Sequence, residues 1–331
     1  MDHRANDRND PACDLLVIAA GIRPNAEIGL RAGLTVGRAI VVDNHMRSVD
    51  DANVYAVGEC AQHRGQVYGL VAPRRLDLRA LARDVYPKGL AQKRELEYAS
   101  RQLTSIEING TYYGSQKPES FARWREETPE GFVFALKGPS FTTNRRILAE
   151  AGSSIERFFS TGVMNLKEKL GPVNWQFLPA KRFDPADFEA FLKLLPKSIE
   201  GRKIRHVVEV RHEGFRTAEF VDLLRAYKTG VVLTDKDEFP RIPDVTSAFV
   251  YIRLQRASED EKSGYPAAAL DMWAQRASAW SQGQVPDGLE PLAGPDKRPP
   301  KSRDVFIYFI NAFKPKAPAA AMALIEKLSA G

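Results

Sequence analysis

From residue 86 onward, the hydrophobic positions of the chain follow two alternating periods. Apolar residues three or four positions apart predict amphipathic helices, and short apolar runs interleaved with polar residues predict strands. The predicted strands are 104–109, 132–137, 173–178, 206–211, 230–235, 248–254 and 305–311, and the predicted helices are 92–103, 118–127, 153–170, 185–195, 217–227, 267–282 and 318–328. Strands that alternate with helices imply βαβ units and a parallel sheet. Seven such strands favour an α/β fold of the TIM-like (β/α) barrel type over an open, doubly wound sheet.

The first 73 residues have a different pattern and a different charge. Short apolar runs at 14–20, 39–43 and 53–58 predict short strands joined by turns. Residues 1–73 hold 7 Lys and Arg against 9 Asp and Glu, whereas residues 74–331 hold 41 against 33. We therefore predict two domains, a small N-terminal α/β fragment at 1–73 and the barrel at 74–331. The basic excess of the second domain fits an anionic partner or, more simply, a solvated basic surface.

Polar side chains follow the predicted strands at the point where each strand ends. They are Glu107, Asn109, Lys137, Gln176, Glu209, Arg211, His212, Asp235, Arg253 and Asn311. Because side chains alternate with period two, Glu107 and Asn109 share one face of their strand and the neighbouring isoleucines share the other. In a parallel barrel the carboxyl ends of the strands meet at one rim, where barrel enzymes carry their active sites. We therefore predict a polar site at this mouth.

An interior salt-bridge network is the alternative explanation for these residues. Buried ionisable groups are costly unless they are paired or solvated, so pairs such as Glu107 with Lys137 or Glu209 with Arg253 would also account for them. Both interpretations place the same side chains inside the barrel. Only the first requires a cavity that a ligand can enter.

The residue types at the mouth suit acid–base or metal chemistry. Glu107, Glu209, His212 and Asp235 form a candidate acid–base set or a ligand set for Mn²⁺, Mg²⁺ or Zn²⁺, although His212 could equally support a neighbouring residue. The cationic residues Lys137, Arg211 and Arg253 could hold a phosphate or another anion. A hydrolase or isomerase that acts on a small anionic or sugar-like ligand is therefore the sharpest hypothesis.

Composition narrows the remaining classes. No apolar run approaches the roughly 20 residues that a membrane helix needs, and the polar N-terminus lacks the apolar core of a signal peptide, so we expect a cytoplasmic protein with no membrane partner. The chain has 2 cysteines, too few for a disulfide scaffold or a cysteine-rich zinc site. Nucleic acid or another polyanion is the alternative partner, although no basic run is interleaved with aromatic residues.

The N-terminal fragment resembles a known family. The strings AAGIRPN at 19–25, IVVDNHM at 40–46 and VYAVGECAQHRG at 54–65 are similar to the flavin-binding domain of pyridine nucleotide-disulfide oxidoreductases, and in particular to the large subunit of NADH-dependent nitrite reductase. The resemblance implies that Gly58 and Glu59 contact the flavin. However, FAD and NAD sites need a glycine-rich turn at the pyrophosphate, and no G-x-G-x-x-G occurs in the chain. We therefore expect no bound FAD, and a residual FAD/NAD oxidoreductase role is the alternative.

The rest of the chain resembles a second family, the proteins called domain of unknown function 72. The resemblance rests on the strings VYPKGL at 85–90, EINGTYY at 107–113, FALK at 134–137, EVRH at 209–212, YIR at 251–253 and YFIN at 308–311. It implies a TIM-like barrel and carries no settled reaction. Asn144, Phe215 and Gln255 depart from the residues usual in the family, which puts a transfer of function in doubt.

The first strand of the resembled family is not visible in this sequence. In the family a strand and the motif Gly-Trp-x-Tyr-x-x-Trp precede the match at Tyr86, whereas RRLDLRALAR stands here at 74–83. Two hypotheses follow. The segment Val67–Val71 substitutes for the missing strand, or an out-of-frame fusion has left the barrel open and the product inactive, because a gap exposes unpaired strand edges.

Overall fold

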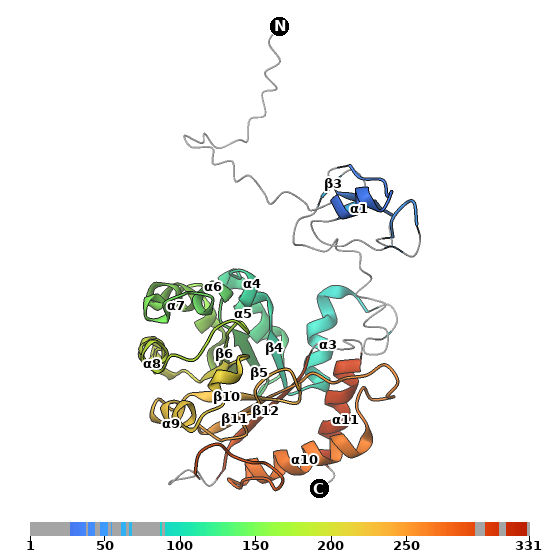
Figure 1. Cartoon of the computed structure of the whole chain (residues 1–331). Coiled ribbons are helices and arrows are strands. Elements are labelled where there is room, and N and C mark those ends of the chain that lie inside the picture. The colour runs from blue at the N-terminus through green and yellow to red at the C-terminus, as the bar shows by residue number, and fades with distance from the viewer. Residues whose placement is uncertain are drawn as a thin grey trace. The chain divides into compact units, whose positions relative to one another are not determined.

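The protein consists of two compact units, Met1–Ala80 and Leu81–Gly331, which are described separately below. The structure is a computed structural model (Figure 1). It describes residues 27–37, 39–43, 47–51, 54, 61–63, 66–67, 87, 90–294, 302–310 and 316–329. Within these ranges no helix is long and apolar enough to cross a membrane.

The first unit contains one short helix and a small sheet. The helix α1 (Glu27–Arg31) is followed by β1 (Ile40–Val42), β2 (Ala61–His63) and β3 (Gln66–Val67), and β2 lies between a parallel β1 and an antiparallel β3. Ile40, Val42 and Ala61 form its small buried core. The strand predicted at 39–43 is confirmed, while the one predicted at 14–20 and most of the one predicted at 53–58 lie outside the described residues.

The second unit is a nearly closed parallel barrel of seven strands. In the order of the sheet the strands are β12 (Asp304–Phe309), β11 (Phe249–Leu254), β10 (Gly230–Thr234), β9 (His206–Glu209), β6 (Leu170–Gln176), β5 (Val133–Lys137) and β4 (Ser105–Ile108). Every neighbouring pair is parallel. The seven strands predicted from the hydrophobic pattern, and the TIM-like fold, are therefore confirmed.

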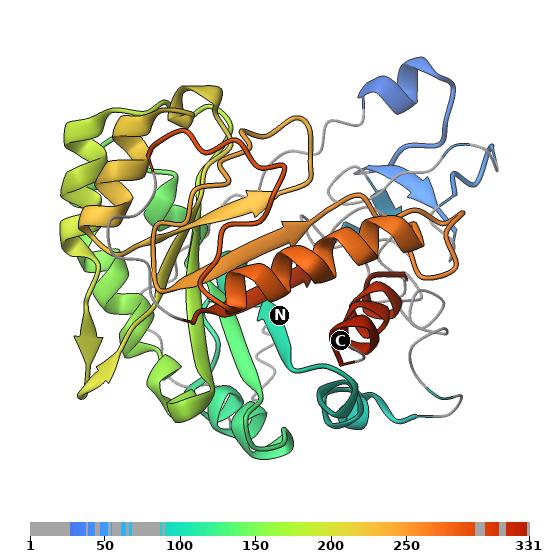
Figure 2. The same ribbon diagram turned by 90° about the horizontal axis from the view of Figure 1, so that it is seen from below.

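Helices cover the outside of this barrel. They are α3 (Glu95–Gln102), α4 (Gly110–Tyr113), α5 (Pro118–Glu127), α6 (Ser140–Thr143), α7 (Gly152–Ser160), α8 (Pro185–Leu194), α9 (Ala218–Ala226), α10 (Ala267–Ser281) and α11 (Ala317–Ser329). Figure 2 shows α10 beside α11 along one side of the barrel. The start of α8 follows from its sequence, because Asp184 caps the free backbone N–H of Asp187 at 3.1 Å and Pro185 fits the first turn.

The barrel has an apolar interior layer below a polar one. Ala135, Val207, Val232, Tyr251 and Phe306 belong to one buried cluster contributed by five strands. Residues of the opposite parity along the same strands pack outward against the helices in two larger apolar clusters. The polar residues at the strand ends therefore lie above an apolar layer that includes the rings of Tyr251 and Phe306.

The two edge strands of the sheet, β4 and β12, approach each other without pairing. The Ser105 hydroxyl donates to Val133 O at 2.8 Å, so the Tyr308 hydroxyl, 2.7 Å away, donates to Ser105 Oγ across this seam. This is the place where a first strand would complete the barrel. Val67, proposed above as part of a substitute strand, pairs instead with Gln62 in the N-terminal sheet, and residues 68–71 lie outside the described ranges.

Replacing Tyr308 with phenylalanine tests this link. We expect the variant to lose about 0.5–1.5 kcal/mol, because one buried hydrogen bond disappears while Ser105 keeps its bond to Val133. For a unit of this size that corresponds to a fall in Tm of about 1–6 °C. Tyr113, 83% exposed, provides the matched control, and Tyr113→Phe should leave the Tm unchanged. Equal melting of the two variants would show that the seam bond contributes nothing.

One local prediction was wrong, and one small element was not predicted. The helix predicted over 153–170 ends at Ser160, because Gly162 adopts a φ of +95°, and a 3-10 segment, Val163–Lys169, follows it. The hydrophobic spacing continues across this break and hides it. The hairpin of β7 (Ser198–Ile199) and β8 (Arg202–Lys203) was not predicted, although Gly201 at its turn has a φ of +73° and is a typical turn residue.

Candidate functional site

Arg253 lies at the centre of the polar layer and links two carboxylates. Its Nη2 donates to Glu107 Oε1 at 2.8 Å, and its Nη1 donates to Glu209 Oε2. The strands β11, β4 and β9 supply these three residues, and their side chains are 3%, 2% and 4% exposed. The predicted pair of Glu209 with Arg253 is confirmed. Glu107 also pairs with Arg253, rather than with Lys137 as the interior-network alternative suggested.

The remaining oxygens of both carboxylates are also engaged. Tyr251 donates to Glu107 Oε2 at 2.5 Å, and Arg211 donates to Glu209 Oε1 through Nε at 2.9 Å and Nη2 at 2.6 Å. The Nδ2 of Asn174 lies 3.5 Å from Glu107 and 3.3 Å from Glu209. Each of the four carboxylate oxygens therefore already accepts at least one hydrogen bond within the barrel.

Charge balance keeps this network ionised. Burial alone would raise the pKa of Glu209, but the guanidinium groups of Arg253 and Arg211, together with Lys137, hold that pKa below its usual value. Burial likewise opposes the charge of Arg253, and the two glutamates outweigh it and raise its pKa. Glu209 and Arg253 therefore both stay charged throughout the physiological pH range, and they do not exchange a proton. We call the polar network around them the platform; it consists of Glu107, Lys137, Asn174, Glu209, Arg211, Tyr251 and Arg253.

Lys137 behaves differently, because no ion pair with a carboxylate is found for it in the described part of the chain. Lys137 is 4% exposed, and its ammonium group donates to Gln176 Oε1 and lies 4.3 Å from the centre of the Tyr112 ring. Burial lowers the pKa of Lys137 to about 8, helped by the nearby charge of Arg253 and opposed by Glu209 and Glu107. The pKa of Lys137 therefore lies much closer to neutral pH than the ordinary value of 10.5.

These residues line a cavity of about 620 Å³ at the carboxyl ends of the strands. Glu107, Asn109, Lys137, Arg211 and Arg253 all contribute to its wall, and residues of β12 and α11 form the opposite side. Three of the five are cationic and one is anionic, and the buried Glu209 behind them brings the platform to a net charge of +1. The cavity is suited to a small anion with polar groups.

Two buried polar atoms of the platform have no hydrogen-bond partner among the described residues. They are Oδ1 of Asn174, an acceptor, and Nε of Arg253, a donor. Buried polar atoms are normally paired, and each unpaired one costs about 1–3 kcal/mol.

The structure does not gather every predicted site residue at the mouth. His212 accepts a hydrogen bond from Gly214 N at 2.9 Å and caps a short 3-10 helix, Glu213–Phe215. Asp235 accepts from Gln255 N at 2.7 Å and from Tyr265 at 2.8 Å, in a different cavity. Asn311, Gly58 and Glu59 lie outside the described residues.

The four residues predicted to bind a metal are divided between separate places. Glu107 and Glu209 are held by Arg253, whereas His212 and Asp235 belong to other local networks. In the described part of the chain, no three His, Cys, Asp or Glu side chains come together as metal ligands. The four residues therefore do not form one metal site. Glu107 and Glu209 bind Arg253, His212 caps a 3-10 helix, and Asp235 lies in a different cavity.

Sequence reasoning missed several residues of the platform. Tyr251 shares a strand face with Arg253, and Asn174 shares one with Gln176, so the period-two rule places both pairs inside the barrel. Tyr112 follows the strand end after Asn109 and supplies the ring beneath Lys137. Tyr251 and Tyr112 were not predicted as site residues, because a sequence pattern assigns an aromatic residue to the apolar core. The contact of the Tyr251 hydroxyl with Glu107 and that of the Tyr112 ring with Lys137 appear only in the structure.

Comparisons with known proteins bear on both units. The model of the family described as pyridine nucleotide-disulphide oxidoreductase matches residues 3–76. Over 69 residues the chain is 52% identical to the assimilatory nitrate reductase electron transfer subunit of Bacillus subtilis (strain 168), which is 21% of this chain and 9% of that protein. It is 45% identical over 80 residues to the nitrite reductase [NAD(P)H] of the same organism, which is 24% of this chain and 10% of that protein. The chain thus spans about a tenth of these relatives.

Solved structures similar to this chain share the barrel. A DUF72 family protein from Thermotoga maritima MSB8 superposes with a TM-score of 0.58 at 20% identity, over 74% of this chain and 93% of that chain. A DUF72 family protein from Enterococcus faecalis V583 gives a TM-score of 0.55 at 18% identity, over 72% of this chain and 94% of that chain. These likenesses concern the fold alone. The family model described as protein of unknown function DUF72 matches residues 77–331, most of the chain, and the protein therefore belongs to this family and carries an oxidoreductase-like fragment at its N-terminus.

Proposed function

We propose that the barrel is an acid–base enzyme, a hydrolase or isomerase, that acts on a small anionic or sugar-like substrate in the mouth cavity. One observation carries the proposal: Lys137 is a buried amine that lines this cavity and has a pKa of about 8. Amines shifted toward neutral pH by burial are typical of catalytic sites, because they can both give and take a proton there.

The other residues of the mouth support Lys137 in distinct ways. Arg211 is 17% exposed at its side chain and combines a bidentate contact to Glu209 with a place on the cavity wall. Its guanidinium group suits the binding of a phosphate or carboxylate of the substrate. Glu107 and Glu209 position the arginines and do not transfer protons themselves. This assignment reverses the roles that the sequence suggested for the carboxylates and for the lysine.

Proton transfer through Lys137 has a defined pH window. Below pH 8 the side chain is an ammonium ion, which attracts an anionic substrate and can protonate a leaving group. Above pH 8 it is an amine, which accepts a proton but no longer attracts the anion. At pH 7 about one molecule in ten carries the amine form, so both forms are available.

Binding of sugar phosphates as a function of pH tests the proposal. Titrations with glucose 6-phosphate and ribose 5-phosphate should show an affinity that falls about tenfold from pH 7 to pH 9, because the ammonium of Lys137 loses its proton in this range. Followed by ³¹P and ¹H NMR, the same mixtures would reveal hydrolysis or isomerisation. The Lys137→Met variant should bind more weakly and show no such pH dependence. An identical pH profile in the variant, or no binding of either probe, would overturn the proposal.

A further inference from the structure

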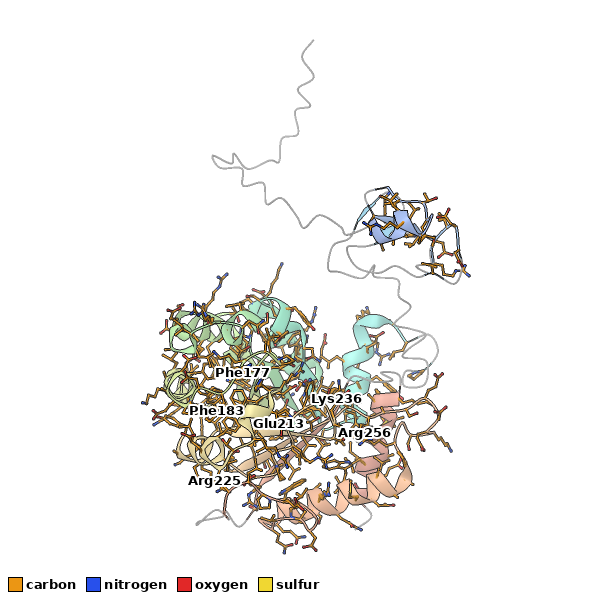
Figure 3. All side chains as sticks on the ribbon, in the orientation of Figure 1. Phe177, Phe183, Glu213, Arg225, Lys236 and Arg256 are labelled. Atoms are coloured by element: carbon orange, nitrogen blue, oxygen red, sulfur yellow. The ribbon has the colours of Figure 1, made fainter. Side chains whose placement is uncertain are left out.

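A separate cavity of about 510 Å³ lies beside β10 and β11 and shares no lining residue with the mouth cavity. The connection between these two strands, residues 235–248, contains turns but no helix, although other crossovers of the barrel carry one. The helix α9, which precedes β10, contacts that strand, and α10, which follows β11, supplies one wall of the cavity. Figure 3 labels Lys236 and Arg256, which come two residues after the ends of β10 and β11 in the sequence.

The cavity combines an apolar floor with three arginines. Its apolar lining consists of Leu233 on β10, Ala269, Met272 and Trp273 on α10, and Leu289. The three arginines are Arg241 in the connection, Arg256 after β11 and Arg276 on α10. A cation beside an apolar cavity destabilises the protein unless an anion lies close to it. The ion pairs of each arginine therefore show whether the cavity has a cation that a ligand could neutralise.

Of the three arginines of this cavity, Arg276 is the one for which no ion pair with a carboxylate of the described residues is found. Arg241 and Arg256 approach one exposed carboxylate, that of Asp237, at 3.7 and 3.4 Å. The guanidinium of half-buried Arg276 instead stacks over the ring of Trp273 at 5.1 Å, and no ion pair is found for it within the described ranges. Burial and the charge of Arg241 lower the pKa of Arg276, as expected for two cations that face one cavity.

The acidic residues of the lining do not neutralise Arg276. Asp235 is engaged by Gln255 N and by the hydroxyl of Tyr265, which in turn accepts from Arg256 N at 2.7 Å. Asp260 accepts from the hydroxyl of Ser258 at 3.3 Å. Asp260 and Glu261 stand on the loop after β11, and neither approaches Arg276 within ion-pair distance.

We propose that this cavity, the Arg276 pocket, binds a small organic anion with an apolar body. The carboxylate or phosphate head of the ligand meets the guanidinium of Arg276 at the side that faces Arg241, and the aromatic or aliphatic body packs on Leu233, Ala269 and Trp273. The planar fork of an arginine suits both head groups, and its stacking on Trp273 fixes its direction. The pocket is a second ligand site, independent of the mouth.

Calorimetric titration of the full-length protein with phenyl phosphate, benzoate and benzyl alcohol tests the pocket. At least one of the two anions should bind, and the tighter one identifies the head group. Benzyl alcohol, which has the ring without the charge, should bind at least tenfold more weakly. In Arg276→Gln the anion affinity should fall about tenfold or more, and Arg276→Lys should recover part of it. A second variant, Ala269→Phe, fills the floor without a change in charge and should abolish binding.

A control variant separates this site from other cations. Arg157→Gln removes an exposed arginine of α7 and should not change the affinity of the anionic probes. Unchanged binding in both Arg276→Gln and Ala269→Phe would overturn the proposal, as would the failure of both anions to bind the wild-type protein at millimolar concentration.

Discussion

Replacing Arg253 with leucine is expected to reduce the free energy of unfolding by about 3–5 kcal/mol, the usual effect of removing one partner from a buried ion pair. Arg253 faces two buried carboxylates, so the variant leaves Glu107 and Glu209 without their shared cation. Urea denaturation at pH 7 measures the loss. The matched control is Arg123→Leu, an arginine that is 65% exposed and lies 3.8 Å from Glu127, which should stay within about 0.5 kcal/mol of the wild type.

The loss should depend on pH in a direction that identifies its cause. In the wild type the pKa of Glu209 is lowered, so its contribution to stability is present above the unfolded value of about 4.3 and disappears as the pH falls through the folded value. Without Arg253, burial dominates and the pKa of Glu209 rises. The difference between variant and wild type should therefore begin to shrink above about pH 4.3, where the raised pKa lets Glu209 of the variant take up a proton, and should shrink further below it as the wild type loses its own contribution.

Neutralising the glutamates offers an independent check of the same argument. The triple variant Arg253→Leu, Glu107→Gln, Glu209→Gln carries no unpaired buried charge and should recover part of the lost stability. A deficit that is the same in the single and triple variants would show that packing around the arginine stem, rather than charge, accounts for the destabilisation.

The strands of the barrel and the place of the site could be predicted because both depend on a strict repeat. Period-two alternation fixes which side chains point inward, and parallel strands bring their carboxyl ends to one rim, so Glu107, Lys137, Glu209 and Arg253 were expected there. Their convergence follows from the geometry of the barrel, whatever the exact bounds of each strand. The same rule applies to Asn174 and Tyr251, whose positions could have been read in the same way.

The pairing within the site could not be predicted, because it depends on distances across the barrel. The sequence offers Glu107 two cations, Lys137 on the adjacent strand and Arg253 on a strand far along the chain, and the fold selects the second. His212 and Asp235 follow strand ends as closely as the other residues do. Their side chains are nevertheless engaged by local backbone N–H groups of Gly214 and Gln255, and no linear pattern shows this.

Replacing Lys137 with methionine is expected to reduce turnover by about 10²–10⁴-fold, the usual contribution of one acid–base group, for any sugar phosphate that the wild type converts. Methionine keeps much of the length and apolar volume of the lysine stem and removes only the titrating amine. Arg211→Lys, which alters the anion contact but keeps the charge, should raise KM more than it lowers kcat.

The stability of the Lys137→Met variant distinguishes a catalytic lysine from a structural one. The pKa of Lys137 falls from 10.5 to about 8 on folding, so the folded protein binds this proton less well than the unfolded chain does. At pH 7 this shift lowers the free energy of unfolding by about 3 kcal/mol relative to a lysine with an unshifted pKa. The deficit disappears as the pH rises from about 8 to about 10.5. Methionine removes the deficit, so the variant should be as stable as the wild type or more stable at pH 7, and this advantage should vanish at high pH. A residue that lowers stability and raises turnover is maintained for its chemistry, because packing alone would favour its replacement. A variant that unfolds more easily at pH 7 would instead assign Lys137 to the structural network of the barrel.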